Sequence, residues 1–334
     1  MKVAVIGGAG FIGTRLCGIL LDRGYALTIL DIRPSPVYPE KSLNVDVRSL
    51  PELKQGLEGH DAVINLAAVH KDNIRPVSLY YDVNVQGARN ICAAAADLEI
   101  TTMIFTSSVA VYGFAPANTN ESGLINPFSD YGRSKWQAEE VFRRWARDDA
   151  RRALTVVRPT VVFGPRNRGN VYNLLSQIAS GRFLMVGNGR NVKSMAFVDN
   201  VAGFLMHSLS TEPGEHLYNY VDKPDLSMND LVKLVHEFLP KTRTASLRVP
   251  YFVGYSAAKL LDLVALFLKR EFSISSIRVK KFCSTTQFDA EKINSTDFVP
   301  PVSIAAALRH TIDFEFGNTN QSSDTDKKIL FFTE

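Results

Sequence analysis

A glycine-rich turn directly after the first apolar run is the feature that most restricts the fold of this chain. Residues 2–6, Lys-Val-Ala-Val-Ile, form a short β-branched run that is typical of a strand buried on both faces. Gly7, Gly10 and Gly13 follow at intervals of three, and residues 11–23 continue with the apolar spacing of a helix. Glycines permit the tight turn and let backbone N–H groups at the helix start approach a pyrophosphate. The sequence therefore predicts a strand–turn–helix unit that binds a dinucleotide.

The end of the next apolar run carries a carboxylate suited to the same ligand. Residues 26–31 predict a second strand that ends at Asp31, 18 residues after Gly13. A carboxylate at this place can accept hydrogen bonds from both hydroxyls of the adenosine ribose, and it would repel a 2′-phosphate. NAD is therefore favoured over NADP. Arg33 keeps NADP open, because a nearby arginine can accommodate that phosphate.

Apolar strands and amphipathic helices alternate along the first half of the chain. Further strands are expected at 61–66, 103–107 and 154–158, with helices near 80–97 and 131–150. This alternation is typical of right-handed crossovers and of a parallel sheet with helices on both faces. We therefore expect an α/β fold, a Rossmann doubly wound parallel sheet with a smaller C-terminal substrate-binding lobe.

The pattern loosens into shorter elements in the second half, which suggests a division of the chain. We expect residues 1–165 to form an NAD-binding Rossmann domain that carries the catalytic residues. Residues 166–316 are expected to form the substrate lobe, with some segments returning to the main sheet. The polar stretch 317–334 is expected to be a mobile tail.

Composition and residue spacing exclude several classes of protein. The net charge of +4 over 334 residues is too small to indicate a nucleic-acid partner. Cys17, Cys92 and Cys283 are odd in number and form no CxxC pair, which indicates a reducing compartment without structural zinc. The six histidines contain no HExxH pair, so no metal is expected. The N-terminus begins directly as a strand and turn, without the apolar core of a signal peptide, and we expect a cytoplasmic protein.

One apolar segment in the second half needs separate treatment. Residues 251–268 are rich in aliphatic and aromatic side chains but are interrupted by Lys259 and Asp262. The segment is too short and too polar for a membrane span, so no membrane insertion is expected. An amphipathic helix on the lobe is the favoured interpretation, and contact with a membrane surface is the alternative.

A tyrosine and a lysine lie four residues apart at the start of the helix predicted near 131–150. Tyr131 and Lys135 therefore share one helix face. A tyrosine with its ordinary pKa of about 10 is a poor base unless a nearby cation stabilises the phenolate, which Lys135 can do. Ser107 and Ser108 follow the strand at 103–107, and ligands bind at the carboxyl ends of strands in such sheets. Together these residues predict a site for proton and hydride transfer.

These motifs resemble the extended short-chain dehydrogenase/reductases, and in particular the NAD-dependent nucleotide-sugar epimerases and dehydratases typified by UDP-glucose 4-epimerase. The resemblance rests on the three-apart glycines, on the Tyr-x-x-x-Lys pair, on Arg-Pro-Thr-Val-Val-Phe-Gly-Pro at 158–165 and on Lys-Ser-Met-Ala-Phe-Val-Asp-Asn at 193–200. It implies that Ser108, Tyr131 and Lys135 are catalytic. It implies these cofactor contacts: Gly7, Gly10, Phe11, Ile12, Gly13, Asp31, Arg33, Asp46, Val47, Leu66, Ala67, Ala68, Asn84, Ser107, Tyr131, Lys135 and Pro159.

The residues after the catalytic serine restrict the reaction within this family. The sugar-nucleotide dehydratases that this chain resembles carry an acidic pair directly after the catalytic hydroxyl. Val109 and Ala110 occupy these two positions here, so dehydration lacks its general acid. Simple hydride chemistry remains, and the Ser-Ser-Val-Ala-Val-Tyr-Gly segment at 107–113 resembles that of UDP-sugar 4-epimerases and related 4-ketoreductases. The resemblance implies NAD-dependent epimerisation of a nucleotide sugar, expected to be a UDP-hexose at C4, through a 4-keto intermediate. The alternative is an NAD(P)-dependent 4-ketoreductase or a hydroxysteroid-type alcohol dehydrogenase with exchangeable cofactor. A redox-sensing binding protein is disfavoured, because it would not need the Ser-Tyr-Lys set.

The resemblance also proposes contacts to the substrate and a homodimer. Asn170 matches an asparagine that meets the nucleotide, whereas Lys193 and Arg278 match the cations of the diphosphate, and Ser108 contacts the sugar. Lys193 replaces an arginine of the family and so loses bidentate geometry. The family forms dimers through the helices near 80–97 and 131–150, and its members serve polysaccharide biosynthesis.

Overall fold

The computed structural model describes residues 1–71, 74–239, 247–268 and 275–317. Its centre is a seven-stranded sheet in which all neighbouring strands are parallel, in the order β3-β2-β1-β4-β5-β6-β10. The strands are β1 (Lys2–Ile6), β2 (Ala26–Asp31), β3 (Ser42–Asn44), β4 (Ala62–Asn65), β5 (Thr102–Thr106), β6 (Ala153–Pro159) and β10 (Gly214–Tyr220). The strand order reverses between β1 and β4, and in open α/β sheets the crevice at that point binds the ligand.

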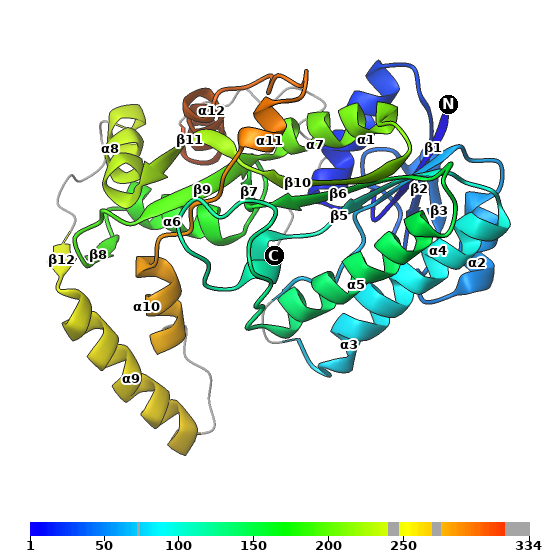
Figure 1. Ribbon diagram of the computed structural model, residues 1–334. Coiled ribbons are helices and arrows are strands. Elements are labelled where there is room, and N and C mark those ends of the chain that lie inside the picture. Colours follow the sequence, from blue (N-terminus) through cyan, green and yellow to red (C-terminus); the bar gives the residue numbers. More distant parts are fainter. Residues whose placement is uncertain (72–73, 240–246, 269–274, 318–334) are drawn as a thin grey trace.

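Helices cover both faces of this sheet, as Figure 1 shows. On one face α1 (Phe11–Asp22) packs against α7 (Val198–His207) over a core that includes Val5, Leu16 and Phe204. On the other face lie α2 (Leu50–Leu57), α3 (Ser78–Tyr81), α4 (Gly87–Asp97) and α5 (Asp130–Arg147). The strands are buried on both sides, which explains their almost continuous apolar sequences. The expected Rossmann fold is confirmed.

The second half of the chain adds a lobe with its own core. A three-stranded sheet has the order β11-β9-β7, and β8 pairs with β12. These strands are β7 (Val161–Phe163), β8 (Leu184–Val186), β9 (Val192–Phe197), β11 (Asp222–Ser227) and β12 (Leu247–Val249). The helices are α6 (Asn170–Ala179), α8 (Met228–Phe238), α9 (Tyr251–Leu268), α10 (Ser276–Cys283), α11 (Glu291–Asn294) and α12 (Ile304–Phe316). Figure 1 shows that α9 and α10 extend from the end of the lobe away from the main sheet.

The observed elements differ from the expected ones at several places. The helix expected near 80–97 consists of α3, one π-helical turn at Asp82–Gln86, and α4. Strand β10 comes from the second half of the chain and pairs in parallel with β6 at the edge of the main sheet. The polar stretch expected to be a mobile tail lies outside the described residues, apart from Gly317.

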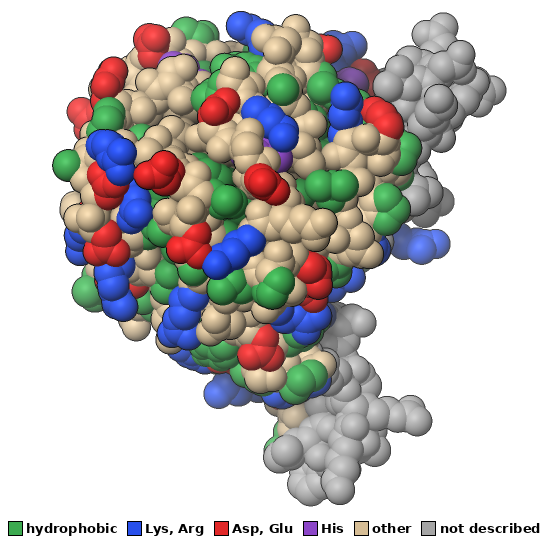
Figure 2. Space-filling model, turned by 90° about the vertical axis from the view of Figure 1, so that its right-hand side faces the viewer, with side chains coloured by type: hydrophobic (Ala, Val, Ile, Leu, Met, Phe, Trp, Pro, Cys, Tyr) green, Lys and Arg blue, Asp and Glu red, His purple; other side chains and the backbone are tan. Residues whose placement is uncertain are grey.

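The described surface and interior give three further observations. On the end of the molecule in Figure 2, basic and acidic side chains alternate across the surface. Cys17 and Cys92 are buried, Cys283 is partly exposed, and all three are free thiols. Within the described ranges, no helix is long and apolar enough to cross a membrane, and no group of three or more His, Cys, Asp or Glu side chains is placed to hold a metal ion.

Candidate active site

The glycine turn forms a close-packed cradle between β1 and α1. Gly7 has a φ of +76°, and a Cβ built on it would lie 2.6 Å from the backbone nitrogen of Ala67. A Cβ on Gly13 would lie 2.6 Å from the Cα of Gly8, whereas Gly10 has slightly more room. No side chain caps the N-terminus of α1. This backbone fits the pyrophosphate of a dinucleotide, because side chains are excluded where the ligand and the neighbouring segment approach.

The segment after β4 runs against this cradle. Leu66 and Ala67 both approach Gly7, as the family's segment beneath the cofactor requires. At the other side of the turn, Phe11 and Ile12 open α1 and pack their side chains toward the core of the lobe. Ala68 follows in the same irregular segment, which joins the carboxyl end of β4 to the helices below the sheet.

Asp31 lies at the carboxyl end of β2, beside the glycine turn. Its Oδ2 accepts a hydrogen bond from Ala9 N at 3.1 Å, and its Oδ1 accepts one from Arg33 N at 3.2 Å. Burial raises the pKa of the Asp31 carboxyl, and these backbone hydrogen bonds oppose the increase. The side chain of Arg33 is exposed. The structure thus places the proposed ribose acceptor next to the proposed pyrophosphate cradle.

The expected adenine contacts are near β3. The carboxylate of Asp46 is already paired with Arg48, which donates from Nε at 3.0 Å and from a terminal nitrogen at 2.5 Å. This pairing holds the Asp46 pKa below its usual range. Val47 is buried, and its carbonyl accepts a hydrogen bond from Asn90 Nδ2 at 2.9 Å. The contact of Asp46 with the adenine amino group stays a prediction.

Asn84 uses its side-chain amide within the protein. Its Oδ1 accepts from Val69 N at 2.8 Å, and its Nδ2 donates to Val69 O at 3.0 Å and to Ser134 Oγ at 2.9 Å. Both amide hydrogens therefore have protein partners. In this structure Asn84 fixes the segment after β4 against α5, and its contact with the cofactor stays a prediction.

Tyr131 and Lys135 lie one turn apart at the start of α5. Ser129 caps this helix by accepting a hydrogen bond from Gly132 N at 3.1 Å, which fixes Tyr131 in the first turn. Ser108 follows β5, and its Oγ accepts a hydrogen bond from Ala110 N at 3.1 Å. Accepting this bond leaves the hydroxyl hydrogen able to reach a substrate oxygen. The start of α5 and the end of β5 thus carry the three predicted catalytic residues.

Lys135 is only 2% exposed, and its Nζ lies 4.2 Å from the centre of the Phe105 ring. Burial lowers the pKa of Lys135 to about 7, and the nearby carboxylate of Glu139 opposes the decrease. A lysine with this pKa gains or loses its proton near neutral pH. Strongly perturbed groups of this kind are typical of active sites.

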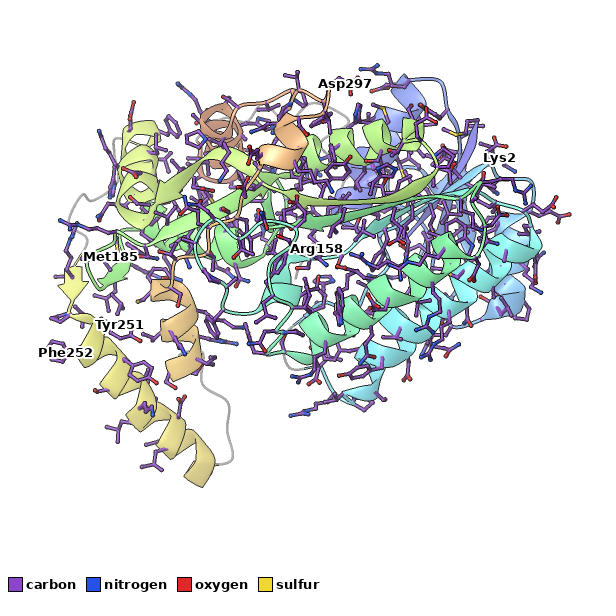
Figure 3. All side chains as sticks on the ribbon, viewed as in Figure 1. Lys2, Arg158, Met185, Tyr251, Phe252 and Asp297 are labelled. Carbon is purple, nitrogen blue, oxygen red and sulfur yellow. The ribbon has the colours of Figure 1, made fainter. Side chains whose placement is uncertain are left out.

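Glu139 belongs to a buried polar network that the sequence did not predict. The mixture of five arginines with acidic residues in the sequence near 137–152 predicts a solvated helix face that includes Glu139. That prediction is wrong for Glu139, because its side chain is fully buried. It accepts hydrogen bonds from Arg158 Nε at 2.8 Å and from a terminal nitrogen of Arg158 at 2.6 Å. Arg158 lies at the centre of the molecule in Figure 3. The spacing of Tyr131, Lys135 and Glu139 was the available signal, because it puts all three on one helix face.

Two other members extend this network. Ser107 donates to Glu139 Oε1 at 2.5 Å, so its hydroxyl faces the protein interior. Arg158 also donates to Tyr112 Oη at 2.6 Å, and Tyr112 donates to Asn219 Oδ1 at 2.8 Å. Ser107 was expected as a cofactor or supporting contact, and the structure gives it the supporting position.

A cavity of about 290 Å³ opens beside Tyr131, between the start of α5 and helix α10. Arg75, Arg278 and Lys281 supply cationic side chains to its wall. The structure thus brings the predicted substrate residue Arg278 to the predicted base. Asp130 and Arg133, which also line the wall, form an ion pair at 3.1 Å.

The other predicted substrate residues do not line this cavity. Lys193 donates from Nζ to the carbonyls of Lys281 at 2.9 Å and Ser284 at 2.6 Å, so it holds the end of α10. Burial lowers its pKa to about 8. Asn170 is exposed at the start of α6. Pro159 ends β6, directly after Arg158.

The parallel sheet and the group of residues at its carboxyl edge define a dinucleotide-dependent redox enzyme of the Rossmann class. The family model of the NAD dependent epimerase/dehydratase family matches residues 3–220. The chain therefore belongs to this family, and its cofactor is NAD.

Comparisons with individual proteins extend the likeness over almost the whole chain. The chain is 47% identical, over 97% of its length and 98% of the relative, to the N-acetyl-alpha-D-glucosaminyl-diphospho-ditrans,octacis-undecaprenol 4-epimerase of Escherichia coli O157:H7. It is 27% identical to the 2-alkyl-3-oxoalkanoate reductase of Stenotrophomonas maltophilia, over 92% of this chain and 98% of that one. The solved UDP-N-acetylglucosamine 4-epimerase of Bacillus cereus has a TM-score of 0.75 at 18% identity, covering 93% of this chain and 98% of that one. The solved structure supports the fold.

Proposed function

We propose that this protein is an NAD-dependent 4-epimerase that acts on an N-acetylhexosamine joined through a diphosphate to a polyprenol. The observation that carries the proposal is the 47% identity, over nearly the full length of both chains, to an epimerase whose name states such a substrate. The sequence motifs predict a UDP-hexose instead. Both substrates contain a sugar diphosphate, and they differ in the group on its far side.

The cavity beside Tyr131 supports a diphosphate-linked substrate. Arg75, Arg278 and Lys281 provide three cationic side chains near a tyrosine that can act as a base. Guanidinium groups bind phosphate oxygens through pairs of parallel hydrogen bonds, and an ammonium group adds charge. A diphosphate held there would leave the attached sugar close to Tyr131.

The chemistry follows from the three residues at the sheet edge. When bound, NAD supplies an acceptor for the hydride of sugar C4 and later a donor that returns it. The Tyr131 phenolate takes the proton of the 4-hydroxyl, and the Ser108 hydroxyl donates a hydrogen bond to that oxygen. After the keto sugar turns over in the cavity, Tyr131 gives the proton back to the same oxygen, and the bound cofactor would return the hydride to the opposite face of C4. No net oxidation would occur, so the cofactor would be regenerated in place and would need no exchange.

Lys135 and Glu139 set the charge around this proton transfer. A protonated Lys135 stabilises a nearby phenolate, but its burial favours the neutral amine. The Glu139 carboxylate raises the Lys135 pKa and so keeps the ammonium form accessible at neutral pH. The pair therefore supplies a cation that can stabilise a phenolate at Tyr131.

The test is a comparison of substrates with the purified protein. It is incubated separately with N-acetylglucosaminyl-diphospho-undecaprenol in detergent, with UDP-N-acetylglucosamine and with UDP-glucose, and the sugar is then released and identified. We expect conversion of the lipid-linked sugar to its 4-epimer, and dinucleotide released by denaturation should be near-stoichiometric NAD. Conversion of UDP-sugars alone would show a nucleotide-sugar epimerase. Accumulation of NADH with a keto product would show a dehydrogenase.

Two variants separate the catalytic tyrosine from a general effect on the fold. Tyr131→Phe should reduce turnover by about 10²-fold or more while NAD remains bound, as expected for a lost general base. Tyr25→Phe is the matched control, because Tyr25 precedes β2 at the opposite edge of the sheet. Normal turnover in the Tyr131 variant would refute the assigned role.

We further propose that the enzyme works as a cytoplasmic homodimer in polysaccharide biosynthesis. Three free cysteines and an NAD cofactor support a reducing interior. Helices α4 and α5 pack side by side on the outer face of the sheet, where a second copy could continue the layer as a four-helix contact. Light scattering of the purified protein would give the mass of a dimer, whereas a monomer mass would contradict this part.

A further inference from the structure

Helix α9 exposes a continuous apolar face at the end of the lobe. Phe252, Leu260 and Leu263 are 71%, 63% and 51% exposed, and Val253 and Val264 are also exposed. Figure 3 shows Phe252 pointing away from the rest of the molecule. These positions recur at the three- and four-residue spacing of a helix, so they form one stripe. A stripe of large apolar side chains in water marks a surface that binds another apolar surface.

The opposite side of α9 is fixed to the lobe. Asp262 accepts a hydrogen bond from the backbone nitrogen of Ser276, at the start of α10, at 3.0 Å. Ala258 is buried, and a Cβ on Gly254 would lie 2.8 Å from a methyl carbon of Val186 on β8. The helix is therefore held in a defined orientation by its inner side. This orientation leaves the apolar stripe of α9 on the side of the helix that faces away from the lobe.

Helix α10 connects this face to the active site. One end of the α9–α10 contact is the hydrogen bond at Ser276, and Arg278 and Lys281 on α10 line the cavity beside Tyr131. A surface that touches α9 therefore lies one helix layer away from the residues proposed to hold the diphosphate. Figure 1 shows the same arrangement, with α10 between α9 and the body of the molecule.

We propose that the outer face of α9 docks on the surface of a phospholipid bilayer with anionic headgroups. This inference rests on the proposed function, because a polyprenyl diphosphate has its hydrocarbon chain in the bilayer and its sugar at the surface. Exposed Lys259, on α9 itself, lies beside the stripe and complements negative headgroups. An apolar stripe beside a basic side chain is typical of a helix that lies in the membrane interface.

The docking arrangement gives the active site access to a substrate that does not leave the membrane. Phe252, Leu260 and Leu263 enter the boundary between headgroups and acyl chains, while the inner side of α9 stays packed on α10. The diphosphate then needs to reach only from the bilayer surface to the cavity wall formed by Arg278 and Lys281. The polyprenol chain remains in the lipid throughout.

The test is flotation of the full-length, NAD-containing protein with vesicles that contain no substrate. One set contains phosphatidylethanolamine with a minority of phosphatidylglycerol, and the other contains only phosphatidylcholine. The wild-type protein should float with the anionic vesicles. The double variant Leu260→Glu/Leu263→Glu should bind the anionic vesicles at least about tenfold more weakly than the wild type, because it loses two apolar contacts and adds two negative charges.

The matched control places the same substitution outside the stripe. Val299→Glu alters a side chain that is 80% exposed. It follows Asp297, which lies on the opposite side of the molecule in Figure 3, so this variant should bind vesicles as the wild type does. Lys259→Glu serves as a second variant with a mild change, and it should weaken binding to the anionic vesicles several-fold and leave binding to phosphatidylcholine nearly unchanged.

Catalysis separates failure of docking from failure of the proposed function. The double variant should keep wild-type turnover on a short, water-soluble prenyl diphosphate sugar and lose it on the undecaprenyl substrate in vesicles. A wild-type protein that epimerises the soluble substrate but does not bind vesicles would overturn docking alone. Vesicle binding without any epimerisation would overturn the proposed function. A change of mass in the double variant by light scattering would identify the stripe as a contact between copies and would also overturn docking.

Discussion

Replacing Lys135 with methionine should remove a pH dependence of stability from the cofactor-free protein. The Lys135 pKa falls from 10.5 to about 7 on folding, because the side chain is buried. Between these values the unfolded chain binds more protons than the folded one, so the free energy of unfolding rises with pH. The slope approaches about 1.4 kcal/mol per pH unit, and from about pH 7 to pH 9 this group contributes about 2 kcal/mol of added stability.

The assay is denaturant unfolding of both proteins at the two pH values. Cys17, Cys92 and Lys193 also have pKa values shifted by burial, but they contribute equally to both proteins and cancel in the difference. Lys135→Met should be the more stable protein at pH 7, since it no longer buries an ammonium group, and its advantage should shrink by about 2 kcal/mol at pH 9. Unfolding free energies that change in parallel with pH would refute the assignment of a depressed pKa to Lys135.

Two further pairs of variants test the packing of the site. Glu139→Ala should lower the free energy of unfolding by about 3–5 kcal/mol, because it leaves Arg158 charged and buried without its partner; Glu139→Leu with Arg158→Met should cost much less in the same denaturation assay. Gly13→Val should prevent NAD binding, because the valine side chain would collide with Gly8. The denatured variant should therefore release much less NAD than the near-stoichiometric amount expected of the wild type. Gly24→Ala, at a turn with open space around it, should cost about 1 kcal/mol and keep its NAD. A Gly13 variant that retains NAD would contradict the proposed cradle.

The sequence predicted the elements whose periodicity is long enough to be distinctive. Strand β2 and helix α9 begin and end at the predicted residues. The three-residue strands β3 and β7 were not predicted, because three residues carry no alternation that distinguishes a strand from a loop. Strand β10 was not located either, since its place at the sheet edge depends on pairing with β6, about sixty residues earlier in the chain.

In the site, too, local patterns were predicted from the sequence, whereas contacts between distant segments were not. Tyr131 and Lys135 were found because one helical turn joins them, and Ser108 because it ends a recognisable strand. Glu139 was missed because a glutamate in a charged helix is exposed unless a partner from elsewhere neutralises it, and Arg158 comes from β6. Sequence patterns report local geometry well, but the burial of a charge is decided by tertiary pairing.

The Glu139 carboxylate has a role in the site that an apolar side chain could not fill. Replacing a buried ion pair with packed hydrophobic residues is often neutral or stabilising. At this position, however, the carboxylate is the group that opposes the fall of the Lys135 pKa. Without it, burial alone would drive Lys135 further toward the neutral amine, and the amine would no longer stabilise a phenolate at Tyr131. Making the Glu139–Arg158 pair apolar should therefore reduce turnover much more than it reduces the free energy of unfolding.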